Sequence, residues 1–212
     1  MNIKFFFEIA MKLNIILSLY YSIRFKFPFF ISRGSIISIK KGAKITLDKK
    51  ARLFVGFNTV NNQGAVLQLE KRSEFIIKGS VSIFPGAKIV IMENACLTIG
   101  GGTFLNEGGR IQCRKQINIG NDCAFSWGVL IIDSDFHGIY MNKQTINHDI
   151  AVEIADRVWL GAKSTIQKGV KIESDVIIGS HSLVLKGCYQ SGAVYAGSPA
   201  SYISLHEGWG KL

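Results

Sequence analysis

The stretch that decides the fold is residues 152–185, which have the sequence VEIADRVWLGAKSTIQKGVKIESDVIIGSHSLVL. Every sixth position in this stretch is aliphatic: Ile154, Leu160, Ile166, Ile172, Ile178 and Val184. The position four after each of the first five is small or β-branched: Val158, Ser164, Val170, Val176 and Ser182. An amphipathic helix repeats every three to four residues and a half-buried strand every two, so neither explains the pattern. A period of six indicates instead a repeated unit of one short strand and one tight turn.

The same period extends toward the N-terminus. Three earlier runs keep it, with shifts of register between them: Ile119, Phe125 and Ile131; Ile99, Leu105, Ile111 and Ile117; and Ile77, Ile83 and Ile89. Cys123 and Val129 stand at the companion positions of the first run. The aliphatic residue must point into the narrow interior of such a stack, and its companion must be small because it points inward near a corner. Each coil buries its apolar face only against its neighbours, so many coils are needed for stability.

The hexad pattern resembles that of the bacterial hexapeptide-repeat acyltransferases, over roughly residues 35–203. This resemblance implies an all-β fold, a left-handed parallel β-helix in which three hexads make one triangular coil, with roughly seven coils in this chain. The hand is taken from the resemblance, because parallel crossovers are normally right-handed. We expect a short apolar and basic helical segment at 1–33, the β-helix at 34–203 with an inserted loop at 133–151, and a tail at 204–212.

Composition limits the classes of partner. The chain has 212 residues, 48% of them hydrophobic, which suits one domain with a real core. Its formal net charge of +10 suggests an anionic partner such as a phosphorylated cofactor, an acidic polysaccharide or a membrane surface. A generally basic surface explains the charge equally well, and no basic helix or aromatic motif favours nucleic acid. The four cysteines form no CxxC pair, so we expect small buried thiols in a reducing cytoplasm and no metal.

The N-terminal segment is apolar but short. Its uncharged run from Leu13 to Ile23 cannot span a bilayer, and no small-residue cleavage site follows it. Phe5, Ile9, Lys12, Leu13 and Ile16 fit roughly helical spacing, which predicts an amphipathic helix. We expect it to pack on the end of the main domain in a cytoplasmic protein. The alternative is peripheral contact with the inner membrane.

The repeat is interrupted between Ile131 and Val152. The intervening segment contains two of the four histidines, and long loops in compact domains are usually functional, although a decorative loop is the alternative. Asp133-Ser134-Asp135-Phe136-His137 resembles the D-x-D-x-H motif of enzymes that acetylate bacterial surface sugars. The resemblance implies that His137 is the general base, because imidazole titrates near the working pH and a sugar hydroxyl needs its proton removed. Asp133 or Asp135 then orients His137 or binds the sugar, and His148 is the rival base.

The segment after the loop resembles the family's V-W-I/L-G-S/A signature, in Val158-Trp159-Leu160-Gly161-Ala162. This implies that Trp159 lies beside the thioester of acetyl-CoA, with its indole N–H on the sulfur or the oxyanion, and that the Ala162 amide donates to the thioester oxygen. Ser201 replaces a basic residue of the family's closing motif, so Lys168 or Lys186 would contact the phosphates. The resemblance also implies further donor-site residues, Gly161, Gly179, Ser180 and Lys186, and a contact of Asn106 with the acceptor, although Asn106 is equally well an ordinary turn residue.

These features together predict an acetyl-CoA-dependent O-acetyltransferase of a capsular or lipopolysaccharide sugar, for which a sialic acid polymer would suit the basic charge. An acetyltransferase of a small sugar or an antibiotic is the alternative. A γ-class carbonic anhydrase needs three zinc-binding histidines, and His137, His148, His181 and His206 lack the spacing. A scaffold β-helix would lack the inserted loop. The loop and Trp159 fall on different corners of the prism, so we expect that no single chain closes the site. The resemblance implies a homotrimer in which the loop of one subunit meets the donor bound to the next.

Overall fold

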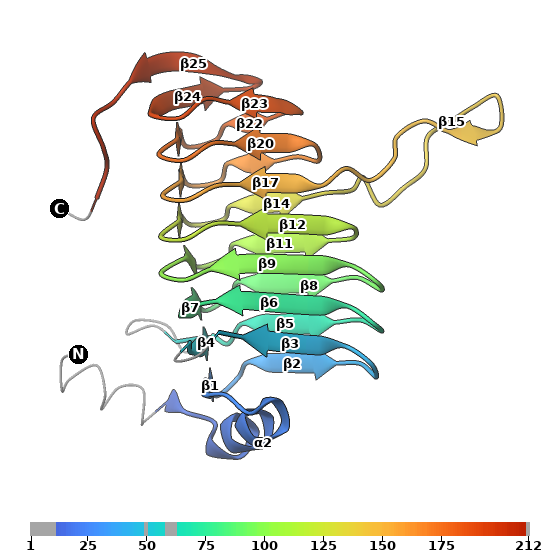
Figure 1. Ribbon diagram of the computed structural model, residues 1–212, viewed down its shortest axis with the longest axis vertical. Helices are drawn as coiled ribbons and strands as arrows, with labels where there is room; N and C mark the ends of the chain where they lie inside the picture. Colours follow the sequence, from blue (N-terminus) through green and yellow to red (C-terminus); the bar gives the residue numbers. More distant parts are fainter. Residues whose placement is uncertain (1–11, 49–50, 58–62, 211–212) are drawn as a thin grey trace.

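The computed structural model describes residues 12–48, 51–57 and 63–210. In this part of the chain the strands stack into a prism with three sheets (Figure 1). Sheet I consists of β1 (Phe29–Ile31), β4 (Leu53–Val55), β7 (Val81–Ile83), β10 (Phe104–Leu105), β13 (Ala124–Phe125), β18 (Trp159–Leu160), β21 (Ile177–Ile178), β24 (Ala193–Gly197) and β25 (Ala200–Leu205).

The other two faces have seven strands each in the described residues. Sheet II consists of β2 (Ile36–Ile39), β5 (Val66–Leu69), β8 (Lys88–Ile91), β11 (Arg110–Cys113), β14 (Leu130–Ile132), β19 (Thr165–Ile166) and β22 (Leu183–Val184). Sheet III consists of β3 (Lys44–Leu47), β6 (Glu74–Lys78), β9 (Cys96–Gly100), β12 (Gln116–Ile119), β17 (Val152–Ile154), β20 (Val170–Ile172) and β23 (Gly187–Tyr189). Neighbouring strands are parallel, apart from the antiparallel pair β24–β25 that ends the stack. The described residues therefore form seven coils, which agrees with the roughly seven that the hexads predict.

The residues singled out by the period of six form the interior of the prism. Those of the late run are all buried, from Ile154 to Val184, and so are their companions from Val158 to Ser182. The three earlier runs are buried as well, Phe125 among them. Glycine is required where coils approach closely: a Cβ on Gly161 would lie 2.6 Å from the backbone nitrogen of Ser180 in the next coil. The period of six thus marks the side chains that are buried and the positions where neighbouring coils approach closely.

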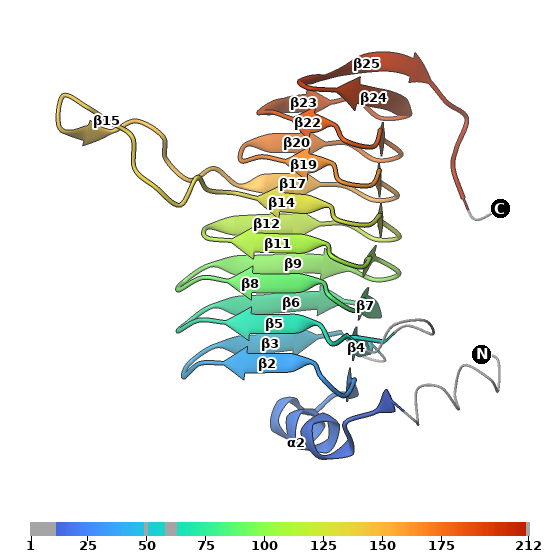
Figure 2. The same ribbon diagram turned by 180° about the vertical axis from the view of Figure 1, so that it is seen from behind.

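The first coil is closed by a helix, α2 (Ile15–Phe25), which lies across the end of the stack opposite β25 (Figures 1 and 2). Asn14 caps its N-terminus by accepting a hydrogen bond from the Leu17 N–H. The helix faces the prism with Ser18 and Tyr21, and the Ser18 hydroxyl accepts from the Ile31 N–H of the edge strand β1 at 3.0 Å. The expected packing of an N-terminal helix on the main domain is confirmed for residues 15–25, whereas Phe5 and Ile9 lie outside the described residues.

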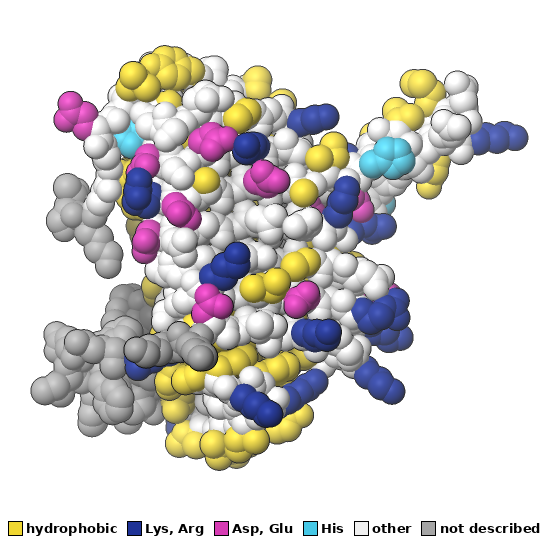
Figure 3. Space-filling model, in the orientation of Figure 1, with side chains coloured by type: hydrophobic (Ala, Val, Ile, Leu, Met, Phe, Trp, Pro, Cys, Tyr) yellow, Lys and Arg dark blue, Asp and Glu magenta, His cyan; other side chains and the backbone are white. Residues whose placement is uncertain are grey.

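The outer face of α2 is apolar. Figure 3 shows hydrophobic side chains gathered at this end of the molecule. No helix in the described ranges has the length and apolar character needed to cross a membrane.

An arm leaves the prism at the corner between sheets II and III. It connects β14 to β17 and ends in a small antiparallel hairpin, β15 (Tyr140–Met141) and β16 (Gln144–Thr145), which projects far from the coils (Figures 1 and 2). The insertion occupies residues 133–151 between the two strands, as expected from the interrupted repeat. At the corner between sheets III and I, the chain after β25 runs back along the turns of earlier coils, because the His206 ring contacts the Asp175 carbonyl and Trp209 donates to the Arg157 carbonyl.

Candidate active site

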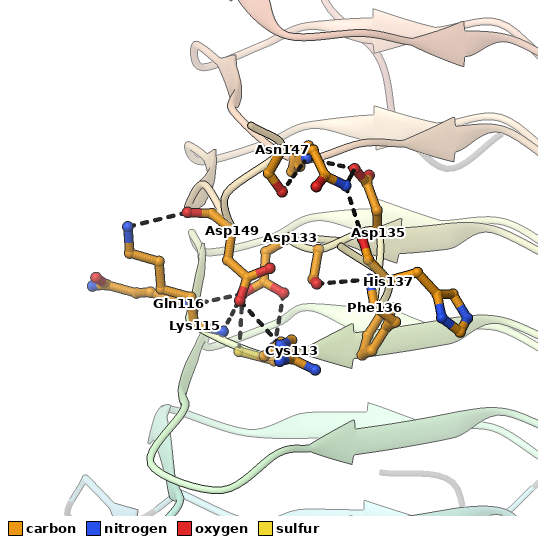
Figure 4. Close-up of polar contacts among 12 residues, drawn as sticks. Cys113, Lys115, Gln116, Asp133, Asp135, Phe136, His137, Asn147 and Asp149 are labelled. Carbon is orange, nitrogen blue, oxygen red and sulfur yellow. Dashed lines mark hydrogen bonds and ion pairs between the residues drawn. The ribbon is translucent and has the colours of Figure 1, made fainter. Parts of the chain in front are cut away.

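The arm is held to the prism by a buried carboxylate. Asp133 is fully buried directly after β14, and its oxygens accept three backbone N–H groups, from Arg114 at 2.7 Å, Lys115 at 2.8 Å and Gln116 at 2.7 Å (Figure 4). The Cys113 thiol lies 3.6 Å from the same carboxylate. Burial, and then the neighbouring Asp133 charge, raises the pKa of Cys113, so this thiol stays protonated. Asp133 therefore ties the start of the arm to the turn at residues 114–116 in the preceding coil.

A second set of contacts closes the base of the arm. The Asn147 side chain donates to Asp135 Oδ2 at 2.7 Å and to the His137 carbonyl at 2.9 Å, and it accepts from the Ile139 N–H at 2.6 Å (Figure 4). Lys168, at the turn after β19, donates to Asp135 Oδ2 at 2.6 Å and to the Asn147 carbonyl at 3.1 Å. Asn147 therefore joins both ends of the arm, and Lys168 ties them to the prism.

The hydrogen bond from Lys168, and then that from Asn147, lowers the pKa of Asp135. A carboxylate with a lowered pKa keeps its charge as the pH falls below the usual range of aspartate. The ion pair between Asp135 and Lys168 is therefore present at neutral pH and is lost only when the pH falls through the lowered pKa.

His137 is exposed, and its ring points away from the carboxylates at the base of the arm (Figure 4). In the part of the chain that the structure describes, neither Asp133 nor Asp135 is hydrogen-bonded to this imidazole. Phe136, just before it, has a φ of 60°, which is strained for an aromatic residue, and its N–H donates to the Ser134 hydroxyl. A hollow of about 150 Å³ is lined by both His137 and His148. The arm thus holds the exposed imidazole of His137 on a constrained backbone, where it can contact a molecule outside this chain.

Trp159 lies on a different face of the prism, in sheet I. Its side chain points outward, 40% exposed, and its indole N–H donates to the Ser126 hydroxyl at 3.1 Å. Trp209 of the C-terminal tail packs beside it, with ring centroids 6.1 Å apart. The two rings line a hollow of about 440 Å³, together with Gly102, Phe104, Asp122, Ala124 and Gly210. The N–H that was expected to meet the sulfur or the oxyanion therefore already has a partner, and the exposed part of Trp159 is its ring.

The remaining residues expected to bind acetyl-CoA lie at two different corners of the prism. Ala162 and Ser180 lie in turns between sheets I and II, and no backbone acceptor within the described ranges takes the Ala162 N–H. Gly161 and Gly179 in the same turns have a packing role, because a Cβ on Gly179 would lie 2.8 Å from Ala196 Cβ. Lys186 is exposed at the corner between sheets II and III, on the side of Lys168 and the arm.

Asn106 also lies between sheets I and II, in the turn after β10. Its side chain accepts from the N–H of the following residue, Glu107, at 2.8 Å. This is the local bond of an ordinary turn asparagine. Its side-chain N–H groups are the part left to meet another molecule.

A single chain does not bring the arm and the tryptophan face together. His137 lies on the arm, which projects from the corner between sheets II and III. Trp159 belongs to sheet I, which does not border that corner. Any site that uses both needs the arm of one copy to reach sheet I of another.

Comparison with known proteins agrees with this architecture. Residues 151–186 match the family described as bacterial transferase hexapeptide (six repeats). Over these residues the chain is similar to the hexapeptide-repeat transferases. Its fold is the left-handed β-helix of the polysialic acid O-acetyltransferase OatWY, with a TM-score of 0.57, 27% identity, and coverage of 84% of this chain and 89% of that one. The structure of the polysialic-acid-specific acetyltransferase NeuO is also similar in fold, with a TM-score of 0.63, 23% identity, and coverage of 84% and 90%.

Two curated sequences are related to parts of this chain. The polysialic acid O-acetyltransferase of Neisseria meningitidis is 45% identical over 56 residues, which are 26% of each chain. The Escherichia coli K12 protein WbbJ, named for O-acetyl transfer in lipopolysaccharide biosynthesis, is 32% identical over 109 residues, 46% of this chain and 55% of that one. The chain thus spans about a quarter and about half of the length of these two relatives.

Two residues of the site, Asn147 and Trp209, were not found from the sequence. Asn147 gave no signal beyond its place on the inserted loop. Trp209 lies in a tail that the repeat does not include. The expectation of four buried cysteines is confirmed for Cys113 and Cys123, but Cys96 is only half-buried and Cys188 is exposed. Residue 188 belongs to β23, near the end of the stack.

Within the described ranges, the chain has no group of three or more His, Cys, Asp or Glu side chains placed to hold a metal ion.

Proposed function

We propose that this protein is an O-acetyltransferase that moves an acetyl group from acetyl-CoA to a sugar hydroxyl of a bacterial surface polysaccharide. The observation that carries the proposal is the arm, which presents the histidine of a D-x-D-x-H motif on a backbone fixed by Asp133 and Asn147. The names of the curated relatives and of the OatWY structure support the choice of acyl group and of acceptor class. Because acetyl-CoA is the proposed donor, we place the enzyme in the cytoplasm.

The proposed reaction uses His137 as a general base. The imidazole takes the proton of the sugar hydroxyl while the oxygen attacks the thioester carbonyl. The tetrahedral intermediate carries an oxyanion, to which the Ala162 N–H donates. The C–S bond then breaks, and the imidazolium returns the proton to the departing CoA thiolate. Trp159 contributes its exposed ring, against which the pantetheine end of the donor packs.

The proposed site lies between subunits of a homotrimer. The arm exposes four large apolar side chains, Ile139, Tyr140, Met141 and Ile146, which is unusual for a loop surrounded only by water. A neighbouring subunit would cover them and would place its own sheet I within reach of His137. Sedimentation analysis should therefore find a trimer, and a purely monomeric protein would contradict this arrangement.

The contacts at the base of the arm change the roles that we assign to the acidic residues. Asp133 is buried and bonded to backbone donors, so we propose that it holds the arm rather than binding sugar. Asp135 positions His137 indirectly, through Asn147. Lys168 is bonded to Asp135, which leaves the exposed Lys186 and Ser180 as the residues we propose for the phosphates and the pantetheine, with Asn106 as a contact to the acceptor.

The proposed function is tested by measuring CoA release from acetyl-CoA in the presence of purified capsular and lipopolysaccharide glycans. Small sugars and aminoglycoside antibiotics serve as the comparison acceptors. We expect turnover with at least one surface polysaccharide, and an acidic one suits the formal charge of +10. Turnover confined to small sugars or antibiotics would favour the alternative acceptor class. No acceptor-dependent release with any of them would contradict the proposal.

Trp209 supplies a prediction about the donor side. Because its ring packs against Trp159, we expect Trp209→Ala to weaken acetyl-CoA binding by roughly tenfold, about the contribution of one aromatic contact. Calorimetric titration with acetyl-CoA measures the change. Trp127→Ala is the control, since Trp127 is an equally large exposed aromatic residue that does not line this hollow. Equal affinity for Trp209→Ala and the unchanged protein would show that the tail does not support the donor site.

A further inference from the structure

The helix that closes the first coil carries apolar side chains on its outward side as well as on the side that faces the prism. A surface helix normally buries its apolar face and exposes its polar face. In α2 the buried residues are Ser18 and Tyr21, and the Ser18 and Ser22 hydroxyls accept the N–H groups of β1 at 3.0 and 2.9 Å. Leu17 and Phe25 pack against the core beside them, whereas the other large aliphatic residues of the helix point outward. The hydroxyls and these inward contacts close the prism, so the outward apolar residues are not required for that purpose.

The outward face of α2 forms a ridge that consists of Ile15, Ile16, Leu19, Tyr20 and Ile23. Their exposed fractions are 64%, 80%, 59%, 54% and 68%. Exposed apolar residues in ordinary numbers are scattered singly over a protein surface. Here five occur within nine positions of one short helix, at one end of the prism (Figure 3). Such a ridge marks an interaction surface.

Basic residues are concentrated in the helix and the first coil. Residues 12–48 contain seven Lys or Arg and one Asp, so more than half of the formal net charge of +10 lies in the helix and the first coil. Exposed among them are Arg24, Lys26, Arg33, Lys40, Lys41 and Lys44. This excess disfavours a second copy of the chain as the occupant, because end-to-end packing would bring two strongly positive ends together.

We infer that this end of the prism, α2 with the first coil, docks on the surface of an anionic lipid bilayer. A bilayer surface matches both properties at once, since the aliphatic ridge enters the boundary between headgroups and acyl chains while Lys and Arg meet lipid phosphates. The prism then stands on the membrane by its N-terminal end. The arm leaves the fifth coil, so it lies about 20 Å above the first coil at the usual spacing between stacked strands. This surface is separate from the proposed site and does not depend on the proposed reaction.

The experiment is flotation of the full chain with vesicles of phosphatidylethanolamine and phosphatidylglycerol in equal parts, compared with pure phosphatidylcholine. The protein should float with the anionic vesicles, weakly or not at all with the neutral ones, and less as salt rises. The double variant Ile16→Ser, Ile23→Ser should bind at least about tenfold more weakly. The variant Lys40→Gln, Lys41→Gln, Lys44→Gln should lose most of its preference for anionic lipid.

The matched control is Ile203→Ser, Leu205→Ser on β25, whose side chains are 57% and 71% exposed at the opposite end of the prism. It should float like the unchanged protein, and circular dichroism should show that all variants are folded. Three results would overturn the inference: an unchanged protein that stays unbound with both vesicle types, equal losses in the ridge and control variants, or equal binding to neutral and anionic lipid. Self-association that disappears in the ridge variant without any lipid binding would assign the surface to a second copy instead.

Discussion

Replacing His137 with alanine should lower the rate of acetyl transfer by about 10²–10⁴-fold, the usual contribution of a general base. The variant loses the group that takes the hydroxyl proton while the arm itself is unchanged, because the Asn147 contact is made to the His137 main-chain carbonyl. The measurement is CoA release with the best glycan acceptor. Binding of acetyl-CoA should stay close to that of the unchanged protein, since the donor face belongs to Trp159.

His148→Ala is the control for this prediction. His148 is exposed and lines the same hollow as His137, but it lies outside the D-x-D-x-H motif. We expect its replacement to change the rate by less than about tenfold. If His137→Ala kept full activity while His148→Ala lost it, the base would be His148. Full activity in both variants would mean that neither histidine acts as the base.

Replacing Asp133 with alanine should give the largest loss of stability among the charged residues of the arm. The change removes an acceptor of three backbone hydrogen bonds and leaves the N–H groups of residues 114–116 without it. Each donor left unpaired costs about 1–3 kcal/mol when buried, and these are only partly buried, so we expect about 2–4 kcal/mol in the free energy of unfolding. Urea denaturation measures it. Activity should fall at least about tenfold, because the start of the arm is no longer held against the prism and His137 is less well positioned.

Asp135→Asn is the matched control for Asp133→Ala. Its side chain is 37% exposed and pairs with Lys168, and pairs that solvent reaches contribute about 0–1 kcal/mol. A small change in stability is therefore expected, with a moderate loss of activity through the weaker link to Asn147. Equal unfolding free energies for Asp133→Ala and the unchanged protein would show that the backbone contacts at residues 114–116 are not what holds the arm.

From Ile77 onward, much of the interior of this protein could be predicted from its sequence, whereas buried residues of the first two coils, such as Phe29, Leu53 and Leu67, fall in none of the runs of six. The period of six selected the buried residues from Ile77 to Val184, because each hexad repeats the same local geometry and each position keeps the same orientation. The break after Ile131 located the arm for the same reason. The roles of Asp133 and Lys168 could not be predicted. Their partners lie 17 to 33 residues away in the sequence and become neighbours only when one coil stacks on the next.

The sequence by itself determined the geometry of the repeated coil, the number of coils, the place of the insertion and the residue types available for catalysis. All of these follow from a local repeat and from where it stops. Only the tertiary structure decided which carboxylate is buried, that Asn147 closes the arm, that Trp209 reaches Trp159, and that the apolar face of α2 points outward. These depend on contacts between separate coils and on which side of a helix meets the end of the prism. The N–H groups of the edge strand β1 need acceptors, so Ser18 and Ser22 face the prism beside Tyr21, and the aliphatic residues on the opposite side of α2 are left exposed.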